Sequence, residues 1–248
     1  MSDSAIPAGE TRRERRRTAR HRGPWVFVRD LVVILVLAIL VSFLLKTFIV
    51  RSFYIPSGSM EDTLLVEDRI LVDQLSPHWA DYQRGEIIVF KDPGGWLPAV
   101  SAPARLPIIE GVESFLTAIG LSTADSQDHL VKRIIGLPGD HVVCCNAVGQ
   151  ITINGAPIDE LVYLKLPAGE TQASRTEFDV VVPANAYWVL GDNRTRSQDA
   201  RAHLDTPTGG FVPRDNIAGR ALLKTWPISR IGLLESHREV FASVPDPQ

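Results

Sequence analysis

The most constraining feature of this chain is an uncharged apolar run, residues 31–45, close to its N-terminus. The run continues past Lys46 as far as Val50 with no further charge. Twenty residues at a rise of about 1.5 Å span roughly 30 Å, the thickness of the hydrocarbon core of a bilayer. We therefore predict that residues 25–50 form a transmembrane anchor, in which Lys46 and Trp25 lie near opposite interfaces.

The residues before this run predict its direction in the membrane. Residues 1–24 are polar and arginine-rich, with seven arginines between Arg12 and Arg22, and we expect them to be disordered. Arginine resists translocation, so this end stays in the cytoplasm and the chain after Val50 lies outside. A cleaved secretory signal peptide has a similar pattern. However, residues 46–53 contain no small-x-small cleavage site, which favours a retained anchor.

Composition excludes several classes of function for the exported part. Residues 51–248 carry more acidic than basic side chains, which argues against nucleic-acid binding. The sequence has no C-x-x-C or His/Cys cluster with metal-ligand spacing and no Gly-rich phosphate loop, so we expect neither a metal nor a cofactor. The two cysteines, Cys144 and Cys145, are adjacent. They suit either a vicinal disulfide or two half-buried thiols, and the sequence leaves both open.

The exported part is predicted to be mostly β, with antiparallel pairing. Short runs rich in Val and Ile alternate with turn signals such as Gly-Asp, Pro-Gly and Asn-Gly. The pair Asn154-Gly155 between two such runs predicts a hairpin turn. We assign residues 51–235 to one β-rich domain and 236–248 to a tail. The predicted strands are 69–73, 86–90, 130–135, 141–144, 150–154 and 187–190.

One segment, residues 93–128, interrupts the strand pattern as an insertion rich in Pro, Gly and Ala. Within it, apolar residues from Ile108 to Ile119 recur at helical spacing. This predicts a short amphipathic helix, which lies either on the membrane surface or against the body of the protein.

Two serines that flank a glycine, Ser57 and Ser59, follow the anchor by a few residues and are typical of an exposed turn. A serine needs a base before it can attack a carbonyl. Lys132 is the candidate base, because it stands in a predicted strand with apolar residues on both sides. Burial disfavours the ammonium form and lowers a lysine pKa from about 10.4 towards neutrality. The other four lysines lie in the anchor, a turn, a polar loop and the C-terminal region: Lys46, Lys91, Lys165 and Lys224.

A third polar segment, residues 190–201, follows the last predicted strand. On its own it is typical of a loop braced by ion pairs, without chemistry of its own. Its polar residues include Asp192, Asn193, Arg194, Ser197, Asp199 and Arg201.

Taken together, residues 56–60, 84–93, 132–140 and 191–201 resemble the motifs of bacterial type I signal peptidases in order and spacing. The resemblance, anchor included, covers most of residues 30–232. It implies a membrane-bound serine endopeptidase that removes N-terminal signal peptides from secreted preproteins. The implied fold is an antiparallel β-sheet catalytic region of signal-peptidase type after one N-terminal transmembrane helix. The implied partners are preprotein signal peptides and membrane lipid, in a single-pass protein of the cell membrane with an extracytoplasmic catalytic domain.

The resemblance also implies a role for each site residue. Ser59 is the nucleophile and Lys132 the general base of a Ser–Lys dyad. The Ser57 hydroxyl joins the backbone N–H of Ser59 in an oxyanion hole, and Ser197 orients the Lys132 amine. Asp62 stands where many members have proline, which makes the turn after the nucleophile less rigid. The implied supporting residues are Met60, Arg133, Asp192, Asp199 and Arg201.

Three other kinds of protein remain alternatives at this stage. A Ser–His–Asp hydrolase needs a catalytic histidine, and His129, His141 and His203 lie near the segments described above. A membrane-tethered β module that binds peptides without cutting them needs no nucleophile. A self-cleaving repressor-type protease shares the Ser–Lys chemistry but has no anchor.

Alanine substitution of each of these three histidines distinguishes the two kinds of hydrolase. If lysine is the base, the variants retain cleavage of a model preprotein within about twofold of the unsubstituted protein, because no histidine carries a proton in the reaction. Initial rates at equal enzyme concentration measure this. A loss of several hundredfold in any one variant would favour the histidine-based mechanism.

Overall fold

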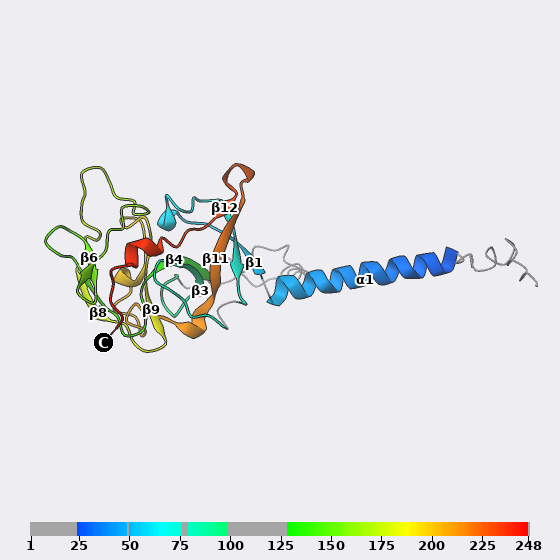
Figure 1. Ribbon diagram of the computed structural model, residues 1–248, viewed down its shortest axis with the longest axis horizontal. Helices are drawn as coiled ribbons and strands as arrows, with labels where there is room; N and C mark the ends of the chain where they lie inside the picture. Colours follow the sequence, from blue (N-terminus) through cyan, green and yellow to red (C-terminus); the bar gives the residue numbers. More distant parts are fainter. Residues whose placement is uncertain (1–23, 49, 76–78, 99–127, 248) are drawn as a thin grey trace, which may run out of the picture. The chain divides into compact units, whose positions relative to one another are not determined.

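The computed structural model describes residues 24–48, 50–75, 79–98 and 128–247. The chain divides into two compact units, residues 1–43 and residues 44–248. The predicted disorder before residue 24 and the predicted helix at 108–119 lie outside the described residues. The described strands confirm a mostly antiparallel β fold (Figure 1).

Helix α1 (Pro24–Phe48) coincides closely with the predicted anchor. Its first residue is proline, whose missing N–H needs no partner at that position. Between Trp25 and Ser42 the helix is long and apolar enough to cross a membrane, and none of this stretch is buried by protein. A helix that exposes large apolar side chains on all sides is typical of a membrane span.

The larger sheet has eight strands, and every pairing in it is antiparallel. Strand β12 (Gly232–Leu233) pairs with β11 outside the main path. The order across the sheet is β1 (Val50–Tyr54), β2 (Arg69–Asp73), β11 (Ile217–Trp226), β3 (Ile87–Lys91), β4 (His129–Gly136), β9 (Ala186–Leu190) and β10 (Val212–Pro213).

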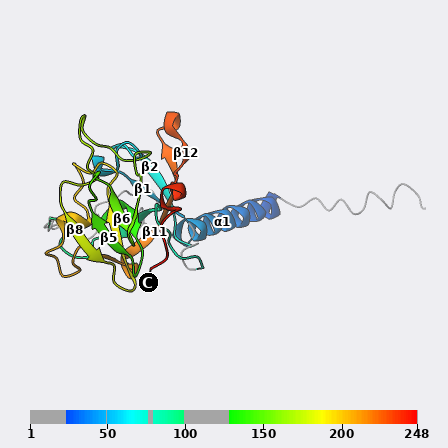
Figure 2. The same ribbon diagram turned by 60° about the vertical axis from the view of Figure 1, so that its left-hand side comes forward.

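A second sheet has four strands, again all antiparallel (Figure 2). The predicted hairpin at Asn154-Gly155 is confirmed: both residues have positive φ, +51° and +82°, as a tight two-residue turn requires. The strand order is β7 (Ala156–Pro157), β6 (Ile151–Ile153), β5 (His141–Cys144) and β8 (Phe178–Val181). Five short 3₁₀ helices are also described: η1 (Gly58–Met60), η4 (Ala200–Ala202), η5 (Arg214–Asn216), η6 (Ile228–Arg230) and η7 (Arg238–Phe241).

Strand β3 supplies side chains to two separate hydrophobic cores. Alternate residues of a strand point to opposite faces of its sheet. Ile88 and Phe90 pack in a large core that the second sheet also lines, whereas Ile87 and Val89 pack in a smaller one with β1 and β2. This two-sided burial explains why residues 87–90 of β3 are all apolar rather than alternating with polar residues.

Two further features concern the sequence predictions directly. The adjacent cysteines at the end of β5 are paired as a disulfide, one of the two states that the sequence left open. Residues in the predicted tail pack on the large core, where Phe241 is buried and Val240 and Val244 lie against it. The domain boundary at residue 235 stays a prediction.

The ion pair between Arg84 and Asp140 gives a test of the fold. Asp140 is fully buried and accepts two hydrogen bonds from Arg84, at 2.8 and 2.6 Å. Asp140→Asn leaves a charged guanidinium without its counter-ion and should lower the free energy of unfolding by about 3 kcal/mol. Urea denaturation of the detergent-solubilised protein measures this.

The matched control is Asp179→Asn, which breaks the exposed pair of Asp179 with His141. We expect a change of at most about 1 kcal/mol there, because water solvates both partners. Equal effects of the two substitutions would contradict this description of the core.

Candidate active site

Ser59 is held at the end of a short, tightly packed connection. Strand β1 leads through Ile55 into η1, which contains Ser59 and Met60. Met60 is buried in the smaller core beside Phe53 and Ile55 and so fixes the backbone next to the serine. Ser59 itself is only 6% exposed. The predicted nucleophile is therefore on a rigid turn with little freedom to move.

Lys132 reaches Ser59 from the neighbouring strand β4. Its Nζ lies 2.9 Å from the Ser59 Oγ and also donates a hydrogen bond to the Val131 carbonyl at 3.1 Å. The side chain is 3% exposed. Burial lowers the pKa of Lys132 to about 8, and this outweighs the nearby carboxylates of Asp199 and Asp192, which raise it. With this pKa about a tenth of the amine is neutral at pH 7, and about half at pH 8, and the neutral amine can accept a proton.

The two remaining serines lie differently from each other. Ser57 is an exposed residue, and its Oγ lies 3.3 Å from Ser59 Oγ. Ser197 Oγ is buried and makes no hydrogen bond of good geometry to any described residue, Lys132 included. It lies against Gly191 and close enough to Asp199 to help lower the pKa of that carboxyl group.

The wall behind the dyad is built from buried charges. Arg133 makes two hydrogen bonds of 2.8 Å to the Asp192 carboxylate, and Thr63 Oγ1 donates to the same carboxylate at 2.6 Å. Asp199 accepts from Arg201 at 2.8 Å to each oxygen and from the Gly191 N–H at 3.0 Å. Although burial raises the pKa of Asp199, the Arg201 guanidinium and these hydrogen bonds hold it below its ordinary value.

The segment 191–194 also contacts the nucleophile directly. The Asn193 N–H donates to the Ser59 carbonyl at 3.1 Å. A Cβ on Gly191 would lie 2.5 Å from the same carbonyl oxygen and 2.2 Å from Ser197 Oγ. Only glycine allows the two segments to approach this closely.

The predicted site residues are thus gathered around Ser59, and two side chains join them that the sequence did not single out. The Glu160 carboxylate pairs with Arg194, and the Tyr163 ring lies over Arg133. Glu160 and Tyr163 both follow the short strand β7, outside the four segments whose motifs predicted the site. The one signal was Arg194, a charged residue of the polar segment 190–201 whose partner the sequence did not reveal.

The three histidines considered above are engaged elsewhere. His203 stacks on Trp96 with ring centroids 4.4 Å apart, His141 pairs with Asp179, and the His129 ring packs against Phe53. Among the described residues, the basic group in contact with Ser59 Oγ is the Lys132 amine. The described ranges also contain no group of three His, Cys, Asp or Glu side chains suited to a metal ion.

Comparison with known proteins identifies the family of this chain. The sequence model of the family described as signal peptidase, peptidase S26, matches residues 28–226. Signal peptidase I of Mycobacterium tuberculosis is 38% identical over 226 residues, covering 84% of this chain and 76% of that protein. Probable signal peptidase I-2 of Synechocystis is 36% identical over 195 residues, covering 79% and 72%.

A crystal structure of signal peptidase I from Enterococcus faecalis matches more distantly. It aligns with 24% identity and a TM-score of 0.35 over 57% of this chain and 97% of that one, which adds nothing to the assignment. The family match extends from the apolar helix to the end of β11, and the relatives are similar over most of their own length. The chain therefore belongs to the signal peptidase family, peptidase S26, whose members are serine peptidases that remove signal peptides from preproteins.

Proposed function

We propose that this chain cleaves signal peptides with Ser59 as its nucleophile and Lys132 as its general base. The observation that carries the proposal is the 2.9 Å contact between a buried lysine amine and the hydroxyl of Ser59. A hydroxyl next to a neutral amine can lose its proton as it attacks, which an isolated serine cannot do at neutral pH.

The reaction then proceeds in two halves. The Lys132 amine accepts the Ser59 proton while Oγ bonds to the carbonyl carbon of the scissile peptide, giving a tetrahedral oxyanion. Collapse of this intermediate breaks the C–N bond, and the Lys132 ammonium gives its proton to the departing nitrogen of the mature protein. Water, deprotonated by the same amine, then attacks the acyl carbon. The C–Oγ bond breaks, Ser59 Oγ takes a proton back from the Lys132 ammonium, and the signal peptide leaves with a free carboxyl group.

The oxyanion in this scheme is stabilised by Ser57 Oγ and the Ser59 backbone N–H. The position of Ser57 supports this role, because the residue is exposed and its hydroxyl is 3.3 Å from the attacking oxygen. In the described structure the Val131 carbonyl holds the Lys132 amine. Ser197 stays the predicted orienting residue. The predicted supporting residues are Met60, Arg133, Asp192, Asp199 and Arg201.

We further propose that the arginine-rich N-terminal segment lies in the cytoplasm and the β-rich unit outside the cell membrane. The arginines before α1 support this orientation by the positive-inside rule. Lipid contact by the β-rich unit is supported by large apolar side chains exposed around η6 and β12, because such side chains favour the membrane interface. These residues are Trp226, Ile228, Ile231 and Leu233.

Removal of either member of the dyad should abolish cleavage. We expect Ser59→Ala and Lys132→Ala each to lower kcat/KM by at least about a thousandfold, and the double variant to be no worse than either, because the two groups act as a unit. Incubation of the detergent-solubilised protein with a model preprotein, followed by mass spectrometry of the products, measures the rate and locates the cut.

Ser52→Ala and Lys91→Ala are matched controls, because each replaces an exposed residue of the same type in a strand. Both should cleave normally. If Ser59→Ala also cleaves normally, the peptidase mechanism proposed for this site is wrong, and a peptide-binding module becomes the better description of it.

The pH dependence tests which protonation state of Lys132 is active. Only the neutral amine accepts a proton, so kcat/KM should rise about tenfold per pH unit below the pKa of Lys132 and level off above it. With that pKa lowered to about 8, the bend should lie near pH 8. A rate that is flat between about pH 6 and 9 would contradict lysine as the base.

A further inference from the structure

The Glu160 carboxylate is enclosed by three hydrogen-bond donors beside the proposed active site. Both terminal nitrogens of Arg194 donate to it, Nη1 at 3.0 Å, and the Tyr163 hydroxyl donates at 2.8 Å. Glu160 is 3% exposed, and Arg194 and Tyr163 are also buried. Burial raises the pKa of Tyr163 well above its ordinary value, so its hydroxyl remains a donor.

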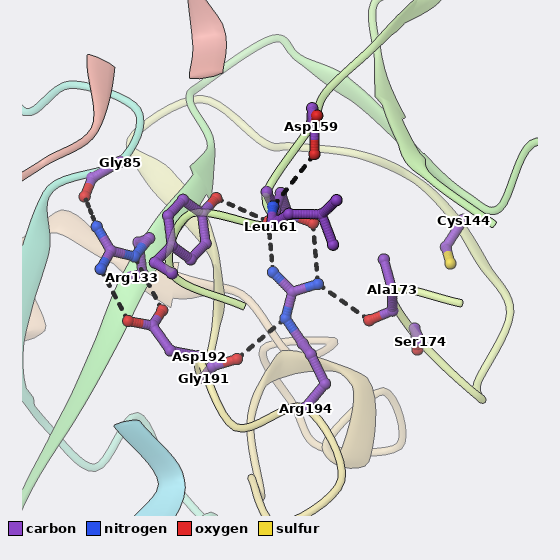
Figure 3. A network of polar contacts seen from close by, with 12 residues as sticks. Gly85, Arg133, Cys144, Asp159, Leu161, Ala173, Ser174, Gly191, Asp192 and Arg194 are labelled. Atoms are coloured by element: carbon purple, nitrogen blue, oxygen red, sulfur yellow. Dashed lines mark hydrogen bonds and ion pairs between the residues drawn. The ribbon is translucent and has the colours of Figure 1, made fainter. Parts of the chain in front are cut away.

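Arg194 uses its remaining donors on backbone carbonyls. Its Nε donates to Gly191 at 3.0 Å and its Nη1 to Ala173 at 3.0 Å, so the guanidinium links Glu160 to two loops (Figure 3). Removing two charges from water is costly, and an apolar pair of similar volume often gives equal or greater stability. A fully satisfied network of this kind instead fixes one arrangement of the backbone groups it binds.

The backbone that Arg194 fixes is the one that holds the nucleophile. In the 191–194 segment, Gly191 packs against Ser59, and the Asn193 N–H donates to the Ser59 carbonyl at 3.1 Å. On the other side, the Lys165 N–H donates to the Asp192 carbonyl at 2.9 Å. Residues 160–165 therefore hold the 191–194 segment in two ways: the Glu160 side chain binds Arg194, and the Lys165 backbone binds the Asp192 backbone.

Tyr163 connects the same network to the strand that carries Lys132. Its ring lies over the Arg133 guanidinium at 4.1 Å, a cation–π contact. Arg133, the next residue after Lys132, pairs with Asp192 and donates to the Gly85 carbonyl at 2.7 Å (Figure 3). Tyr163 is thus connected to both guanidiniums, to Arg133 through its ring and to Arg194 through the shared Glu160 carboxylate.

We infer that Glu160 is a positioning residue of the peptidase site: through Arg194 and Tyr163 it holds the 191–194 segment and β4 so that the Ser59 hydroxyl and the Lys132 amine stay in contact. This inference rests on the proposed Ser59–Lys132 dyad. Glu160 touches neither the substrate nor the reacting atoms in this account.

The expected effect of Glu160→Gln is a change in chemistry rather than in substrate binding. A displacement of about 1 Å at the dyad costs roughly 100-fold in rate, so kcat should fall about 10- to 100-fold, with KM within about twofold. A looser wall admits water to Lys132, which weakens the burial that lowers its pKa. The bend in the kcat/KM profile should therefore move to higher pH.

Tyr163→Phe is the second, milder variant, in case Glu160→Gln fails to fold. It removes one hydrogen bond to the carboxylate and keeps an aromatic ring over Arg133. We expect kcat to fall about threefold to tenfold, which corresponds to the net free energy of one typical hydrogen bond.

The control is Asp140→Asn, which breaks a buried ion pair with no contact to the site. It should lower the Tm but leave kcat per folded molecule and the pH profile unchanged. The inference is overturned if Glu160→Gln behaves like this control, or, where Glu160→Gln does not fold, if Tyr163→Phe keeps full kcat. Ser59→Ala in the same assay distinguishes failure of the proposed dyad from failure of the Glu160 inference. If Ser59→Ala cleaves, the proposed dyad is wrong. If Ser59→Ala is inactive while Glu160→Gln cleaves normally, only the inference about Glu160 is wrong.

Discussion

The site depends on one interaction, the approach of the Lys132 amine to the Ser59 hydroxyl in a place that water hardly reaches. In water the same lysine would be protonated and would not act as a base. The fold lowers the proton affinity of this lysine by burying β4 on both faces and by packing η1 over it, where the buried Met60 holds η1 in place. Burial of apolar side chains thus sets the proton affinity of one amine, which links the packing of the two cores to the chemistry.

Around this amine the protein places charges in closed pairs. Arg133 with Asp192, Arg194 with Glu160 and Arg201 with Asp199 are each buried and bonded on several sides. Three of these charges, Asp192, Asp199 and Arg201, act on the Lys132 ammonium, and each would shift its pKa further if it were unpaired. Paired, they shape the wall while leaving desolvation as the largest influence on the lysine. The same pairs hold the glycine-containing segment that contacts Ser59.

Much of the fold followed from the sequence because its signals are local. Apolar runs such as 86–90 and 141–144 and the Asn154-Gly155 turn predicted strands and a hairpin that the structure confirms. Ser59 and Lys132 were singled out by motifs, and the structure brings them into contact. Glu160 and Tyr163 were not predicted, because their importance lies in contacts across the fold that leave no pattern in one sequence. For the same reason the burial of Phe241 could not be foreseen from its place in an apparent tail.

The protonation of Lys132 is the most direct measure of the central claim. In detergent-solubilised protein with ¹³C-labelled lysine, NMR titration of the Cε resonances follows each of the five lysines, and Lys132→Ala identifies the one concerned. This account predicts a titration midpoint near pH 8 for Lys132, well below that of the exposed lysines. A midpoint near the ordinary lysine value of about 10.4 would show that burial does not lower the pKa of this amine, and the proposed mechanism would be wrong.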